Sequence, residues 1–200
     1  MSKLKKEITK FIKIMMTVLM VFTLVNYNYV NAEDETTNPL TSLRIGYTVL
    51  KSGVTDGSTS NGDTYYNLDN DYNGDYWSWD ADTSTLSLYG EVDLIRADGD
   101  LNIEVTDDSS ITNDNYKYEW GCITVENGSL NLNITKGKTL KTHDTAGVSA
   151  LVYVQNDLTV TGCGVLDVYN SLTTRNFGIQ VGGLYMLKGS GLTQGVSILL

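Results

Sequence analysis

The 200-residue sequence predicts an all-β protein. Within that class it predicts a right-handed parallel β-helix, a solenoid of about four coils of roughly 26–29 residues each behind an N-terminal β cap. Two observations lead to this prediction. Aliphatic residues return at near-constant spacing from position 95 onward, and no stretch beyond position 32 has the 3.6-residue period of a helix. A repeating unit too short to bury its own apolar face must stack on its neighbours.

Three aliphatic columns make up the repeat. The first, with successive spacings of 29, 26 and 26, consists of Ile103, Leu132, Leu158 and Leu184. The second, with a constant spacing of 28, consists of Ile95, Ile123, Leu151 and Ile179. The third consists of Ile111, Leu140, Leu166 and Leu192. Turns rich in Gly and Asn precede the first column. A β-sandwich is the alternative, but it gives no reason for the columns to stay in register. Parallel crossovers are almost always right-handed, which sets the expected hand.

The segment at positions 1–32 has the pattern of a secretory signal peptide. Five lysines precede an uncharged apolar stretch at positions 14–25, and small side chains end the segment at Ala32. The apolar stretch is shorter than the roughly 20 residues that cross a bilayer. The sequence therefore predicts a secreted or extracellular protein, in some settings associated with the cell wall, with no membrane partner after cleavage.

The remaining chain is strongly acidic. Positions 1–32 hold five Lys and one Glu, so the rest carries 9 Lys+Arg against 23 Asp+Glu, a formal net charge of −14. Nucleic acids and anionic lipid surfaces both require a basic patch, so neither is an expected partner. Cys122 and Cys163 fall at different places in the repeat, and two free thiols are expected.

The chain divides into a signal peptide at 1–32, a polar linker at 33–42, an N-terminal β and aromatic capping region at 43–90, and the parallel β-helix at 91–200. Within the cap we expect a strand at 43–50, turns over 52–75, and two strands around Trp77 and Leu86 joined by a turn at 80–83. Residues 195–200 form an apolar, open C-terminal edge. This edge predicts further coils beyond residue 200 or a partner that covers it.

Three short segments carry a resemblance to a known family. Residues 76–80 read Tyr-Trp-Ser-Trp-Asp and residues 85–90 read Thr-Leu-Ser-Leu-Tyr-Gly, followed by Gly-Asp-Leu-Asn-Ile at 99–103. Over residues 74–200 the chain resembles exported β-helix proteins of Gram-positive anaerobes. These are of a carbohydrate-binding-domain type related to polysaccharide-lyase β-helices. The resemblance implies a β-helix at the cell surface and a polysaccharide or host or cell-wall glycan as partner.

One acidic loop has the spacing of a calcium site. Asp69, Asp71 and Asn73 supply oxygen donors at alternate positions, Gly74 turns the chain, and Asp80 stands at position twelve. Calcium is thus the one cofactor to which the sequence points. The alternative is a solvated turn, because Asn, Asp and Gly favour turns in any case.

An aromatic cluster is the candidate ligand site. It consists of Tyr66, Tyr72, Tyr76, Trp77 and Trp79. Flat rings on a β surface can stack on sugar rings. The alternative is that the rings cover the N-terminal end of the apolar core, since large aromatic side chains bury much area in one place.

No catalytic residue is predicted. A calcium-dependent polysaccharide lyase would need carboxylates beside a basic side chain, and Asp98, Glu126, Asp157, Arg96 and Arg175 are the residues that could meet this need. His143 is the only histidine and is expected in a loop, and no nucleophile motif accompanies it. The sequence therefore favours a non-catalytic carbohydrate-binding or adhesive module. A structural stalk and a lyase are the alternatives.

Overall fold

In the computed structural model the described residues are 37–113, 121–144, 150–170 and 177–188. They form strands and turns and contain no helix, which confirms the all-β prediction for this part of the chain. Accordingly, none of them belongs to a helix long and apolar enough to cross a membrane. Residues 38–200 form one compact unit. The predicted signal peptide and the apolar edge at 195–200 lie outside the described residues.

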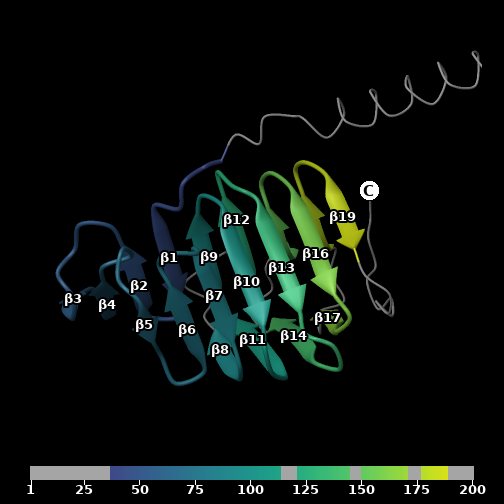
Figure 1. Ribbon diagram of the computed structural model, residues 1–200, viewed down its shortest axis with the longest axis horizontal. Helices are drawn as coiled ribbons and strands as arrows, with labels where there is room; N and C mark the ends of the chain where they lie inside the picture. Colours follow the sequence, from purple (N-terminus) through teal and green to yellow (C-terminus); the bar gives the residue numbers. More distant parts are fainter. Residues whose placement is uncertain (1–36, 114–120, 145–149, 171–176, 189–200) are drawn as a thin grey trace, which may run out of the picture. The chain divides into compact units, whose positions relative to one another are not determined.

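The strands form three sheets (Figure 1). The first sheet has the order β18-β15-β12-β9-β1-β2-β4-β3 and contains β1 (Ser42–Ile45), β2 (Thr48–Lys51), β3 (Ser58–Ser60), β4 (Asp63–Tyr66), β9 (Ile95–Asp98), β12 (Ile123–Glu126), β15 (Ala150–Val154) and β18 (Phe177–Val181). The second has the order β19-β16-β13-β10-β7-β6-β5 and contains β5 (Tyr72–Asn73), β6 (Trp77–Asp80), β7 (Thr85–Leu88), β10 (Leu101–Val105), β13 (Leu130–Ile134), β16 (Leu158–Gly162) and β19 (Tyr185–Lys188). The third has the order β17-β14-β11-β8 and contains β8 (Glu91–Asp93), β11 (Ser109–Asn113), β14 (Thr139–Asp144) and β17 (Val165–Asn170).

Pairing direction changes along the chain. From β7 onward each strand pairs in parallel with the strand three places later, as β10, β13 and β16 do in Figure 1. Every antiparallel pair among the described strands includes one of β1–β6. The change therefore falls within the predicted capping region at 43–90. The apolar core nevertheless continues through both regions.

The aliphatic columns face the core, but their register differs from the predicted one. Ile103 lies opposite Leu132, and Leu132 lies opposite Val160 rather than Leu158. A shift of two positions keeps a side chain on the same face of its strand, so the aliphatic pattern cannot detect it. At the fourth position Leu187 takes the place predicted for Leu184, whose side chain is 57% exposed.

The other two columns are also shifted, the second by one position at β15 and the third by two positions at β14. Val152, not Leu151, lies between Ile123 and Ile179, although both β15 residues are buried. In the third sheet Ile111 lies opposite Thr142 rather than Leu140, which pairs instead with Ser109. Leu192 lies outside the described residues.

Several local predictions of the capping region are corrected. The strand expected at 43–50 is a hairpin of β1 and β2, because Gly46 adopts a positive φ of 55° and reverses the chain. The tract expected to be turns holds the short strands β3, β4 and β5. The hairpin of β6 and β7 is confirmed, with Trp77 opposite Leu88.

Three further predictions concern single residues, and the structure tests each of them. The end of the predicted linker is bound rather than loose, because the Asn38 backbone N–H donates to the Asp100 carboxylate at 2.7 Å. His143 lies in β14 and not in a loop. Cys122 and Cys163 are not joined in a disulfide, as expected, and the Cys122 thiol donates to the His143 carbonyl oxygen at 3.3 Å.

Side chains in the turns satisfy backbone groups of the neighbouring turn. Asp100 accepts the Ser129 N–H at 2.8 Å, and Asp157 accepts the Leu184 N–H at 2.6 Å. Such contacts stabilise the turns, because a backbone N–H left without a partner costs free energy.

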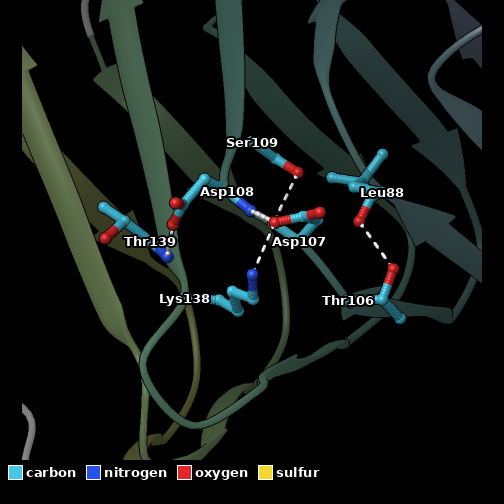
Figure 2. A network of polar contacts seen from close by, with 7 residues as sticks. All are labelled: Leu88, Thr106, Asp107, Asp108, Ser109, Lys138 and Thr139. Atoms are coloured by element: carbon cyan, nitrogen blue, oxygen red, sulfur yellow. Dashed lines mark hydrogen bonds and ion pairs between the residues drawn. The ribbon is translucent and has the colours of Figure 1, made fainter.

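A second turn between the second and third sheets is held in the same way (Figure 2). Asp108 accepts the Thr139 N–H at 2.8 Å, and the Lys138 ammonium donates to Asp107 at 2.7 Å. This hydrogen bond holds the pKa of Asp107 below its usual value. Thr106 donates to the Leu88 carbonyl oxygen at 3.2 Å, so the turn also contacts the preceding strand.

The corrected register predicts unequal effects from two identical substitutions. Leu158→Ala should lower the free energy of unfolding by about 2–5 kcal/mol, because the side chain is fully buried and leaves a cavity. Leu184→Ala should change it by less than about 0.5 kcal/mol, because that side chain is exposed. Urea unfolding of the two variants measures both values. Equal losses would contradict the register described above and restore the predicted one.

Candidate functional site

A groove of about 610 Å³ opens beside the antiparallel strands. Three segments that are distant in sequence surround it: the end of β1 with the β1–β2 turn, the segment from β5 to β6, and β8. Its lining residues are Ile45, Tyr47, Thr48, Tyr72, Asn73, Gly74, Asp75, Tyr76, Trp77, Glu91, Val92 and Asp93. Apolar side chains of the core thus meet tyrosines and carboxylates at the surface.

Two exposed tyrosines from different segments border the groove. Tyr47 is 58% exposed and Tyr76 is 53% exposed. Neither ring is therefore part of the buried core. Tyr47 lies in the turn that Gly46 makes. The Tyr76 ring packs on Gly90, where a Cβ atom would overlap it. Backbone geometry therefore places both rings.

Hydrogen bonds hold the segment that carries Tyr76. The Tyr89 hydroxyl donates to the Trp77 carbonyl oxygen at 2.8 Å, and the Tyr89 N–H donates to the Tyr76 carbonyl oxygen at 3.0 Å. The Gly74 N–H donates to the same Trp77 carbonyl oxygen at 2.8 Å. Both flanks of Tyr76 are thus fixed to neighbouring backbone, which limits the freedom of this wall.

The predicted aromatic residues divide between core and groove. Trp77 and Trp79 are only 7% and 2% exposed, and the Trp79 indole N–H donates to the Leu68 carbonyl oxygen at 2.9 Å. Tyr72 lies between Tyr66 and Trp77, with ring centroids 4.2 Å and 5.0 Å away. The buried tryptophans match the alternative interpretation, in which the rings cover the core.

Of the five predicted residues, Tyr76 therefore offers the groove an exposed ring. Tyr72 and Trp77 reach its lining from the core side, while Tyr66 and Trp79 do not line it. Sequence reasoning missed Tyr47, because the alternating pattern predicts one continuous strand over residues 43–50. The signal that could have found it is the Gly46-Tyr47 pair, which interrupts that strand with a residue suited to turns.

The groove is negatively charged. Asp75, Glu91 and Asp93 are all exposed, and its lining includes no Lys, Arg or His. A hydrogen bond with Tyr66 raises the pKa of Tyr72 to about 12, and burial and the charge of Asp75 act in the same direction. Tyr72 is therefore a neutral side chain at physiological pH.

The predicted calcium residues serve separate turns. Asp71 accepts the Ala81 N–H at 3.0 Å, Asp80 accepts the Thr83 N–H at 2.9 Å, and Asp69 accepts the Ser52 hydroxyl at 3.2 Å. Asn73 lies in β5 opposite Ser78. Within the described part of the chain, no three His, Cys, Asp or Glu side chains gather in a way that could hold a metal ion. Calcium binding stays a prediction.

Several of the residues considered for a lyase form ion pairs or hydrogen bonds with other parts of the protein. Arg96 forms an ion pair with Glu126 on the neighbouring strand, and Asp98 accepts the Asn127 side-chain amide at 2.9 Å. Asp157 binds the Leu184 N–H, and Arg175 lies outside the described residues.

Comparison of the chain with family models, with curated proteins and with solved structures found no match.

The Tyr66–Tyr72 contact predicts a late-titrating tyrosine. Because the folded-state pKa of Tyr72 is raised from 10.0 to about 12, the neutral hydroxyl stabilises the fold fully below pH 10. That contribution is lost as the pH rises from 10 through 12. Tyr66→Phe removes the hydrogen bond, so the pKa of Tyr72 should fall toward 10. NMR titration of ¹³C-labelled tyrosine measures it, and an unchanged pKa in the variant would contradict this cause.

Proposed function

We propose that the chain is a secreted or cell-surface, non-catalytic module that binds carbohydrate in the groove between Tyr47 and Tyr76. One observation carries the proposal: two exposed tyrosine rings from separate segments line a single groove together with carboxylates. Ile45, Trp77 and Val92 add buried apolar side chains to its lining, and Thr48 and Asn73 add polar ones. Apolar and aromatic side chains with a few convergent polar groups are typical of a small-ligand site.

The chemistry of the groove suits a sugar ring. A pyranose has an apolar face of C–H groups, which packs on an aromatic ring, and an equator of hydroxyls, which donate hydrogen bonds. Tyr47 and Tyr76 supply the rings, and Asp75, Glu91 and Asp93 supply acceptors for the hydroxyls. Hydrogen bonds to charged acceptors are stronger than those between neutral groups, which favours a carboxylate rim.

A place outside the cell fits the rest of the sequence. The signal-like pattern of positions 1–32 supports export, and the resemblance at residues 76–80 and 85–90 supports a role at a cell surface. A non-catalytic role is favoured over a lyase because the lining offers no Lys, Arg or His as a base beside its carboxylates.

We further infer that the strands from β7 onward wind as a right-handed parallel β-helix with three strands per coil. The support is the pairing of each strand with the one three places later, in all three sheets. Parallel crossovers of this kind are almost always right-handed. The groove then lies at the N-terminal end of the stack, beside the antiparallel strands.

A structural stalk is the second candidate function. The hydrogen bonds that join successive turns, such as Asp108 to Thr139, favour it because they stiffen a stack whatever it binds. The two functions differ in one respect that can be measured. A stalk needs no sugar, whereas a binding module must retain glycans in a manner that depends on Tyr47 and Tyr76.

The binding proposal predicts a specific effect of ring removal. On a glycan array, and with insoluble cellulose and chitin, the full chain without its predicted signal peptide should bind at least one glycan. Tyr47→Ala and Tyr76→Ala should each weaken that binding about tenfold, since a ring contact contributes about 0.5–1.5 kcal/mol beyond its buried area.

Tyr47→Phe and Tyr76→Phe are the matched controls, because they keep the ring and should retain most of the affinity. Absence of any bound glycan, or equal binding by the alanine variants, would reject the binding function and leave the stalk.

A further inference from the structure

Resting on the proposed function, we propose that the groove takes a cationic amino-sugar chain, whose sugars carry free amino groups that are protonated in mildly acidic solution, and rejects acidic glycans. The site is the tyrosine-lined groove as a whole, and the inference concerns which class of sugar its walls accept.

The carboxylates that line the groove come from two separate segments, the one between β5 and β6 and the strand β8. Glu91 and Asp93 alternate with the buried Val92 on β8, so both carboxylates leave the same face of the strand. Asp93 also packs against Gly46, where a Cβ atom would come within 2.8 Å of its carboxylate oxygen. Asp75 lines the groove from a different segment, directly before Tyr76.

Among the described residues, no ion pair involves a carboxylate of this rim. On the next strand, Glu91 lies opposite Ser110 and Asp93 lies opposite Thr112, both uncharged. Lys141 pairs with Ser110 one strand further on and lines a neighbouring hollow together with Glu91, whereas Asp75 and Asp93 do not line that hollow.

Charge then decides between sugar classes. A uronic acid placed between the tyrosines would bring its carboxylate against three like charges, which is unfavourable, and the formal net charge of −14 beyond position 32 opposes its approach. A protonated amine at the same place donates hydrogen bonds to the carboxylates and pairs with their charge. An N-acetylated sugar keeps the ring but loses the positive charge, so it isolates the electrostatic contribution.

Isothermal titration in mildly acidic buffer, in which the glucosamine amines are protonated and the carboxylates stay ionised, tests the inference with three tetrasaccharides: β-1,4-linked glucosamine, its N-acetylated counterpart, and α-1,4-linked galacturonate. At low salt the glucosamine chain should bind about fivefold more tightly than the acetylated chain, the size expected for an exposed ion pair. The preference should shrink as salt is added. Galacturonate should show no binding.

Glu91→Gln and Asp93→Asn should reduce the preference for the glucosamine chain. Both variants should still bind the acetylated chain, and that binding shows that they are folded. Asp167→Asn, an exposed residue on β17, is the control with the same change of charge and should leave the preference intact.

Equal binding of the charged and acetylated chains, tighter binding of galacturonate, or an unchanged preference in both groove variants would overturn the inference but leave carbohydrate binding in place. No binding of any glycan, here or on the array, would overturn both.

Discussion

The structure depends on the burial of aliphatic rows that cross parallel strands at matching positions. One row consists of Leu101, Leu130 and Leu158, and a second of Ile103, Leu132 and Val160, with no member more than 1% exposed. A strand as short as these contributes only a few inward side chains, too few to bury one another. Each strand therefore relies on the strands beside it, and pairing, register and burial are set together.

The turns follow from this constraint. When inward rows are in register, successive turns are brought close, and their backbone groups must find partners. Asp100, Asp108 and Asp157 each accept a backbone N–H from the next turn, and a Cβ on Gly128 would overlap the Gly99 carbonyl group. The abundance of Asp, Asn and Gly in these turns thus reflects close backbone approach rather than solvent exposure alone.

The sequence could predict those features that depend on neighbours in the chain. Alternating side chains identified the strands and the all-β class, and the hairpin from Trp77 to Leu88 followed from two alternating runs with a turn between them. Register could not be predicted, because Leu158 and Val160 lie on one face of β16 and satisfy the aliphatic pattern equally well. The groove could not be predicted either, since Tyr47, Tyr76 and Glu91 meet only through pairing between distant strands. Tyr76 was found through its neighbours Trp77 and Trp79, which proved to be core residues.

The location of the groove is itself a consequence of the fold. Across the parallel strands of the second sheet, outward positions repeat short polar side chains, as at Asn102, Asn131 and Thr159, because side chains at matching positions lie only about 4.8 Å apart. Two large rings and a space between them do not fit so tight a spacing. In the capping region the hairpins reverse the chain, and the Gly46 turn carries Tyr47 away from the strand rows while Gly90 leaves room for Tyr76. The antiparallel hairpins therefore carry both exposed tyrosines of the groove, while the parallel strand β8 carries its carboxylates Glu91 and Asp93.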